Sequence, residues 1–290
     1  MIMKSRWCIC ALANNMKFFH VMVSNLTKNM KDMAWIVFND DRLADKTQSI
    51  ENELVNAGIR RYKVVKATKV NDEFKKLVED PASVTEYRLS MCLLFLWHVE
   101  KHFKSWDNML YVDDDVVFTP IADDIFEIEK CSFFTGDGFM KMAVKSEQYR
   151  LLTESMIEMF DDRFDANELS ADYVSSCAFT INRSQFDFDK YEKQLVKFFN
   201  DPVVFDFMHR SRKATGFHTD EMFLSSFIHD CGLTDGDFGK MLAFIISKDD
   251  KIRDVTMNNW FKRKCLIHIG NTTWKNVTYD RLIANGLVNV

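Results

Sequence analysis

The chain has 290 residues, a length that suits one large α/β domain or two small ones. Hydrophobic residues make up 47% of it and 26 residues are phenylalanine, so it can bury a substantial core. The 9 glycines and 3 prolines argue against long disordered linkers. The net charge of −5 gives no global reason to expect nucleic-acid binding.

The seven cysteines are scattered along the chain, and no Cys-x-x-Cys pair occurs among them. This pattern indicates neither a zinc knuckle nor a disulfide framework, and it favours a reducing compartment. The apolar run 7–13 is too short for a signal peptide or a membrane anchor. We therefore expect a cytoplasmic protein without an integral membrane segment.

The first part of the chain alternates between strand and helix patterns. The expected strands are 6–13, 34–38, 62–67 and the stretch 109–118, and the expected helices are 16–30, 47–57 and 84–103. This alternation predicts an α/β fold with a Rossmann-like, mainly parallel central sheet and helices on both faces.

After residue 130 the pattern is more mixed. The expected strands are 133–135, 178–181, 242–246 and 265–269, and the expected helices are 146–160, 189–199 and 220–228. No internal repeat or low-complexity segment separates these elements, so residues 1–290 are expected to form a single domain.

Three consecutive carboxylates, Asp113, Asp114 and Asp115, are the most informative feature of the sequence. Apolar residues flank them on both sides, which predicts a buried strand that ends in acid. If the chain is extended there, Asp113 and Asp115 point to the same side and Asp114 points away. Crowded carboxylates repel one another unless a cation compensates them, and oxygen ligands suit Mg²⁺ or Mn²⁺. An acidic loop cap is the alternative interpretation.

With these motifs the chain resembles glycosyltransferase family 8 and its relatives, which have the GT-A fold. The matching segments are Arg88 upstream of the acidic motif, the motif itself in 110–116, and the later segments 175–182, 219–224 and 266–275. The chain departs from the family's pattern at three places: Cys177 replaces a glycine, Glu221 replaces a glutamine, and Trp274-Lys275 replaces Lys-Pro-Trp.

The resemblance implies a metal site made by Asp113, Asp115 and His268, with Mn²⁺ or Mg²⁺ as the cofactor and a UDP-sugar as the donor substrate. It also implies that Lys275 and Arg88 hold the donor phosphates. Residues 1–118 would form the nucleotide-binding half of the domain, and residues 119–290 would form the sugar and acceptor half.

The remaining candidates are assigned by their positions relative to these motifs. Asp220 and Glu221 are the candidate catalytic residues, which would contact sugar hydroxyls or act as a base. The candidate donor-binding residues are Ala11, Asn14 and Asn15 at the end of the first strand, Asp113 and Asp114 in the acidic motif, Ser175 and Ser176, Asp137, and Gly270 beside Lys275.

Each candidate also has a purely structural interpretation. His268 can be a core histidine at a strand end, Asp220 and Glu221 can cap a helix, and Lys275 can be a surface lysine.

Other functions stay open as well. The Asp113–Val117 segment also fits the nucleophile motif of a haloacid-dehalogenase-like phosphatase, although that fold usually opens with the motif. A non-catalytic nucleotide- or sugar-binding protein is a further alternative.

The expected activity is metal-dependent transfer of a sugar from a UDP-sugar to a hydroxyl of a glycan or another acceptor. The resemblance favours retention of the anomeric configuration, while Asp220 or Glu221 acting as a general base would permit inversion.

Overall fold

The computed structural model describes most of the chain. The described residues are 6–42, 44–85, 91–136, 151, 154–155, 158–160, 173–211, 219–233, 238–244, 258–269 and 275–289. Most of the expected helix 146–160 lies outside them.

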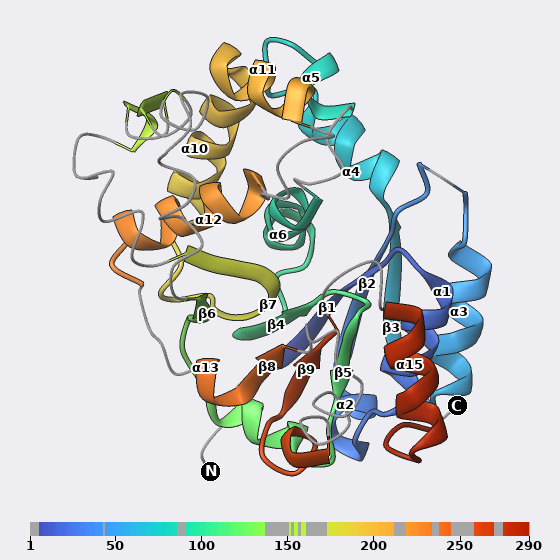
Figure 1. Ribbon diagram of the computed structural model, residues 1–290. Coiled ribbons are helices and arrows are strands. Elements are labelled where there is room, and N and C mark those ends of the chain that lie inside the picture. Colours follow the sequence, from blue (N-terminus) through green and yellow to red (C-terminus); the bar gives the residue numbers. More distant parts are fainter. Residues whose placement is uncertain are drawn as a thin grey trace.

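The centre of the molecule is a six-stranded sheet with the order β3-β2-β1-β4-β7-β6 (Figure 1). Its strands are β1 (Trp7–Ala13), β2 (Ala34–Asn39), β3 (Arg61–Lys66), β4 (Asn108–Val112), β6 (Ser132–Gly136) and β7 (Tyr173–Asn182). The pairs β1–β2, β2–β3 and β1–β4 are parallel, whereas β7 runs antiparallel to both β4 and β6. The carboxyl ends of the four parallel strands therefore share one edge, where open α/β sheets bind their ligands.

Helices cover both faces of this sheet, as the alternation of residues along β1 requires. Cys8 and Cys10 face a core that includes α4 (Ala67–Phe74), α6 (Met91–His102), α10 (Phe188–Asn200) and α12 (Thr219–Asp230). Ile9 and Ala11 face the opposite core, which includes α1 (Met16–Ser24) and α3 (Thr47–Asn56). Figure 1 shows α6, α10 and α12 on one side of the sheet and α1 and α3 on the other.

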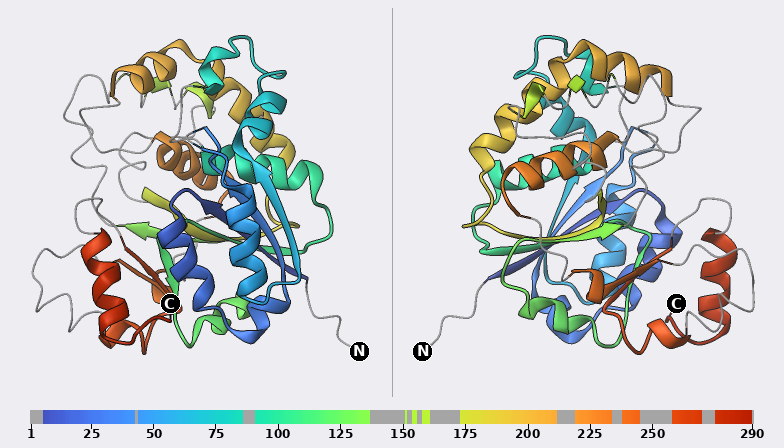
Figure 2. Two further views of the ribbon diagram at one scale, coloured as in Figure 1. Left: turned by 90° about the vertical axis from the view of Figure 1, so that its right-hand side faces the viewer. Right: turned by 60° about the vertical axis from the view of Figure 1, so that its left-hand side comes forward.

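A smaller three-stranded sheet, of order β5-β9-β8, lies beside the main one (Figures 1 and 2). Its strands are β5 (Val116–Phe118), β8 (Leu242–Phe244) and β9 (Leu266–His268). Val117 and Ile267 pack with Tyr279 of α15 (Lys275–Ala284) in a third core. The remaining short elements are α2 (Lys28–Asp32), α5 (Ala82–Thr85), the 3₁₀ helix η2 (Ala122–Glu127), α11 (Pro202–Ser211) and α13 (Phe238–Met241).

The expected fold class is confirmed, but two expected elements are wrong. The helix expected over 16–30 is two helices, because α1 ends at Ser24 and Thr27 begins α2 by accepting a hydrogen bond from the Met30 amide at 3.3 Å. The expected strand 109–118 is also interrupted. The chain turns between β4 and β5, where the Val116 amide donates to the Asp113 carbonyl at 3.1 Å.

Two further expectations concern the cysteines and a membrane-spanning segment. All seven cysteines belong to the described part of the chain, and their thiols are free. Among the described residues, no helix combines the length and the apolar character that crossing a membrane demands.

Candidate functional site

The three consecutive aspartates form the turn that carries the chain from the main sheet into the small sheet. The Asp113 amide donates to the Cys177 carbonyl at 2.8 Å, which continues the β4–β7 pairing by one residue. The Tyr111 hydroxyl donates to Asp113 Oδ1, also at 2.8 Å. The carboxylates therefore lie at the carboxyl end of β4, held by backbone and side-chain hydrogen bonds. The extended conformation assumed for Asp113–Asp115 is wrong, because a turn occupies these residues.

His268 reaches the same edge from β9. Because β5 and β9 are antiparallel and pair Val116 with His268, the histidine lies next to the end of the acidic turn. Its Nε2 atom lies 3.2 Å from Asp115 Oδ1, and the Ile269 amide donates to the Asp115 carbonyl at 2.9 Å. The small sheet thus brings Asp115 and His268, which lie 153 positions apart in the sequence, into contact.

At this edge of the sheet, burial and neighbouring charges shift the pKa values of Asp113 and His268. Burial, together with the Asp115 charge, raises the pKa of Asp113 well above its usual range, although Tyr111 and His268 oppose the rise. Burial alone would lower the pKa of His268, but Cys177 and Asp115 raise it well above its ordinary value. Without a cation, the structure therefore favours protons on Asp113 and His268.

Glu221 approaches from α12, where it lies in the first turn of the helix. Its Oε1 atom accepts hydrogen bonds from the Ser176 amide at 3.1 Å and from Ser175 Oγ at 3.3 Å. Burial raises the pKa of Glu221 to about 7, while the Ser176 amide and His268 act in the opposite direction. A carboxyl group with such a pKa can donate or accept a proton near neutral pH.

Asp220, the other candidate catalytic residue, is buried and accepts a hydrogen bond from the Cys92 thiol of α6 at 3.3 Å. This contact joins the beginning of α12 to α6, on the same side of the main sheet. Asp220 thus has a structural partner within the core as well as a place beside Glu221.

Asp114 has a partner of its own, at the beginning of α1. Its Oδ2 atom accepts hydrogen bonds from the amides of Asn14, at 2.7 Å, and Asn15. Asn15 caps α1 with its side chain, which accepts from the Lys17 amide at 3.0 Å. A carboxylate at a helix N-terminus is stabilised by the unpaired amides and by the helix dipole. Asp114 therefore connects the acidic turn to the end of β1.

Comparison with known proteins is informative at the level of structure. No protein-family model and no curated protein matches the chain. Among solved structures, apo mouse xyloside xylosyltransferase 1 superimposes with a TM-score of 0.51, at 9% identity, over 92% of this chain and 98% of that one.

Two further solved structures are similar to the chain. Galactosyltransferase LgtC with donor and acceptor sugar analogues gives a TM-score of 0.44 at 11% identity, over 98% of this chain and 97% of that one. The apo WbbM bifunctional glycosyltransferase gives 0.46 at 11% identity, over 97% of this chain and 52% of that one.

The chain has the GT-A fold. Within it, the structure brings together Asp113, Asp115, His268, Glu221 and the serine pair Ser175–Ser176. Ala11, Asn14 and Asn15 lie at the neighbouring end of β1, because Ala11 pairs with Val112 of β4.

The remaining candidates of this GT-A site are only partly observed. Arg88, Asp137 and Gly270 lie outside the described residues. Lys275 is the first residue of α15, and its side chain is not among those described.

Three further residues at this edge were not predicted from the sequence to be functional. Tyr111 holds Asp113, Cys177 contributes to the environment of His268, and Lys46 Nζ donates to the Asn14 carbonyl at 2.7 Å. Tyr111 and Cys177 lie within recognised motifs, so position within the motif was an available signal. Lys46 precedes α3 in a polar stretch without such a signal.

A cavity of about 790 Å³ lies elsewhere, lined by residues that include Trp7, Ala34 and Arg61. These three residues begin β1, β2 and β3, so the cavity opens at the amino end of the strands. It is at the opposite edge from the aspartates, and we do not assign the donor to it.

Proposed function

We propose that the protein is a metal-dependent glycosyltransferase that moves a hexose or pentose from a UDP-sugar to a hydroxyl of a glycan or another acceptor. One observation supports the proposal. Asp113 and Asp115, which follow a strand of the main sheet, and His268, which ends a strand of the small sheet, come together at the carboxyl edge of the main sheet. Open α/β sheets bind their ligands at this edge.

The chemistry of these three side chains fits a divalent cation. Two carboxylates and one imidazole form a mixed oxygen and nitrogen donor set, which suits Mn²⁺ better than Mg²⁺. The raised pKa of Asp113, due to burial and the Asp115 charge, indicates a repulsion that a cation would relieve.

Asp113, Asp115 and His268 would hold the ion, and the Tyr111 hydroxyl would keep the Asp113 carboxylate in place through Oδ1. When bound, the ion supplies charge stabilisation for the departing diphosphate.

Residues near that ion would position the donor. We assign the uracil and ribose to Ala11, Asn14 and Asn15, whose backbone follows β1 to the acidic turn. Asp114 keeps Asn14 and Asn15 in place through their amides, so its contribution to donor binding is indirect.

The diphosphate requires cationic and amide donors in addition to the metal. We assign this role to Lys275 at the start of α15, to Arg88 and to the backbone of Gly270. Negative charge that develops on the leaving group is stabilised by such preorganised donors.

Glu221 is the residue that we assign to the transferred sugar. Two serines of β7 fix its carboxyl group, and its pKa of about 7 lets it donate a hydrogen bond to a sugar hydroxyl or accept one. Asp220 positions the first turn of α12 through Cys92. We propose retention of the anomeric configuration, with Glu221 orienting the donor.

A donor panel tests this function. The protein is incubated with Mn²⁺ and UDP-glucose, UDP-galactose or UDP-xylose, and release of UDP and the anomer of the released or transferred sugar are followed by NMR. Turnover of one donor, dependent on Mn²⁺, is the expected result. Hydrolysis of an aryl phosphate without any nucleotide-sugar turnover would identify a phosphatase instead.

A further inference from the structure

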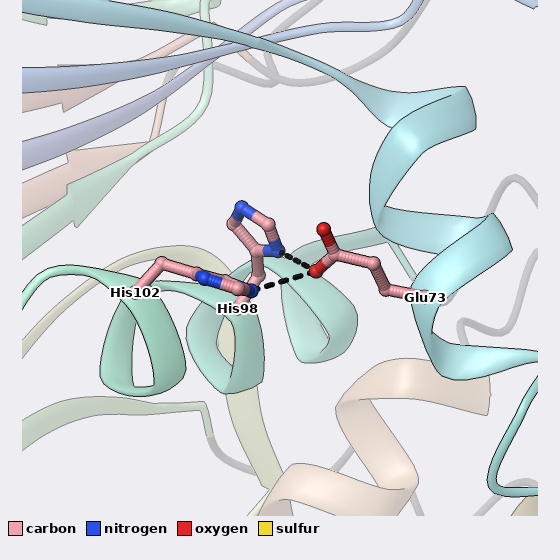
Figure 3. Close-up of side chains that lie close together, drawn as sticks. All are labelled: Glu73, His98 and His102. Carbon is pink, nitrogen blue, oxygen red and sulfur yellow. Dashed lines mark hydrogen bonds and ion pairs between the residues drawn. The ribbon is translucent and has the colours of Figure 1, made fainter.

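A second group of metal-ligand side chains lies away from the acidic turn, between α4 and α6. It consists of Glu73 on α4 and of His98 and His102 on α6, and Figure 3 shows the three side chains converging. Glu73 Oε2 lies 3.1 Å from His98 Nδ1 and 2.7 Å from His102 Nε2. His98 and His102 are four residues apart, so they project from the same face of the helix.

Two of the three groups have pKa values that differ from their ordinary values. His98 is 2% exposed, and its pKa is lowered to about 4 by burial and by the charges of His102 and Lys69, although Glu73 opposes this. Burial would raise the pKa of Glu73, but the net shift is downward because His102, His98 and Lys69 lower it.

His98 Nδ1 provides an independent observation. This atom is buried and lies 3.1 Å from Glu73 Oε2, but the contact does not have the geometry of a hydrogen bond. A buried nitrogen in such a position is costly unless another partner satisfies it. A metal ion bound between His98 and Glu73 would satisfy this nitrogen.

The distances agree with a single ion between the three atoms. Ligand atoms at about 2.0–2.1 Å from a tetrahedral Zn²⁺ are about 3.3 Å from one another. The ligand atoms of Glu73, His98 and His102 all lie within 4.8 Å of one another, with two of the distances at 2.7 and 3.1 Å. A small outward movement of the carboxylate would accommodate an ion.

We propose that Glu73, His98 and His102 form a zinc site that clamps α4 to α6. Two imidazole nitrogens and one carboxylate oxygen are a donor set that zinc accepts, with the fourth position taken by water. The Glu73 and His102 side chains are 24% and 38% exposed, so solvent can reach the site. Phe38 packs against the His98 ring edge-on at 6.0 Å and covers the inner side.

This site is separate from the one assigned to the donor. His102 ends α6, and Cys92, which contacts Asp220, lies ten residues earlier on the same helix. Ten residues of α-helix extend about 15 Å. The proposed zinc ion would therefore act on the packing of α4 against α6, and the inference does not rest on the glycosyltransferase proposal.

The experiment measures zinc binding in the full chain carrying Asp115→Asn, which weakens the other proposed metal site. Calorimetric titration with Zn²⁺ is compared between this protein and the same protein with His102→Ala or Glu73→Gln. His102 is at the surface end of α6, so its removal should spare folding, which circular dichroism checks. The matched control is His20→Ala, because His20 also pairs with a glutamate, Glu53, at 2.6 Å.

We expect one equivalent of Zn²⁺ to bind, at least tenfold more weakly after His102→Ala or Glu73→Gln and unchanged after His20→Ala. Zinc should also raise the melting temperature, because it binds the native state. Co²⁺ should give the visible absorption of a tetrahedral site without a thiolate charge-transfer band. Equal zinc affinity with and without His102, binding through cysteine thiolates, or no zinc binding would overturn the proposal.

Discussion

The substitution Glu221→Gln tests whether the carboxyl group at the start of α12 is buried as the structure shows. Glutamine keeps the oxygen that accepts from the Ser176 amide and Ser175 Oγ, but it cannot ionise. The variant therefore changes the charge of the site while it preserves the hydrogen bonds. Its stability should differ from that of the wild type in a way that depends on pH.

The magnitude follows from the pKa of Glu221, which burial raises from 4.5 to about 7. At about 1.4 kcal/mol for each unit of pKa, this difference corresponds to about 3 kcal/mol. Because the folded-state pKa is raised, the contribution is fully present below pH 4.5 and is lost as the pH rises through about 7. The wild type should thus lose about 3 kcal/mol relative to Glu221→Gln between these limits.

Urea unfolding of both proteins at a series of pH values, in the presence of a chelator, measures this difference. Comparing the two proteins removes the titration of groups that they share. Glu79→Gln is the control, because Glu79 is an exposed glutamate. Parallel stability profiles for the wild type and Glu221→Gln, with no divergence above pH 5, would refute the buried environment of Glu221.

Two further predictions concern the acidic turn and its histidine. Asp114→Asn should destabilise the protein by about 0.5–2 kcal/mol in urea unfolding, since it weakens the hydrogen bonds at the start of α1, and its apparent affinity for Mn²⁺ should remain near that of the wild type. A large loss of Mn²⁺ affinity in this variant would contradict the assignment of Asp114. The affinity of the wild type for Mn²⁺, measured by calorimetry, should rise with pH above the ordinary pKa of histidine, because His268 must lose its proton to bind the ion. Affinity that does not change with pH in this range would exclude His268 as a ligand.

The parallel half of the fold was predictable because its strands are short apolar runs alternating with amphipathic helices. The break between α1 and α2 was not, since the apolar periodicity of 16–30 continues across Asn25 and Thr27. Helix α4 is short and presents a narrow apolar stripe of Val70 and Phe74, so it was missed, and with it Glu73. The cluster of Glu73, His98 and His102 could not be predicted without that helix.

The candidate site was predictable where it depends on local motifs. Asp113 and Asp115 follow a buried strand, and that position at a sheet edge is a local property of the sequence. Their geometry was not predictable, because apolar residues on both sides of the motif conceal a turn into a second sheet. The pairing of Val116 with His268 is a long-range contact, and only the fold determines it.

Stabilisation of the protein by UDP is the most direct test of the metal site. Melting temperatures are measured with UDP in the presence of Mn²⁺ and in excess chelator, for the wild type and for Asp115→Asn. The diphosphate and the aspartates are all anionic, so a cation must lie between them. We predict that UDP raises the melting temperature of the wild type only when Mn²⁺ is present. The variant Asp115→Asn should largely lose this response. Equal stabilisation of the wild type by UDP in excess chelator would contradict the proposed metal-bridged donor site.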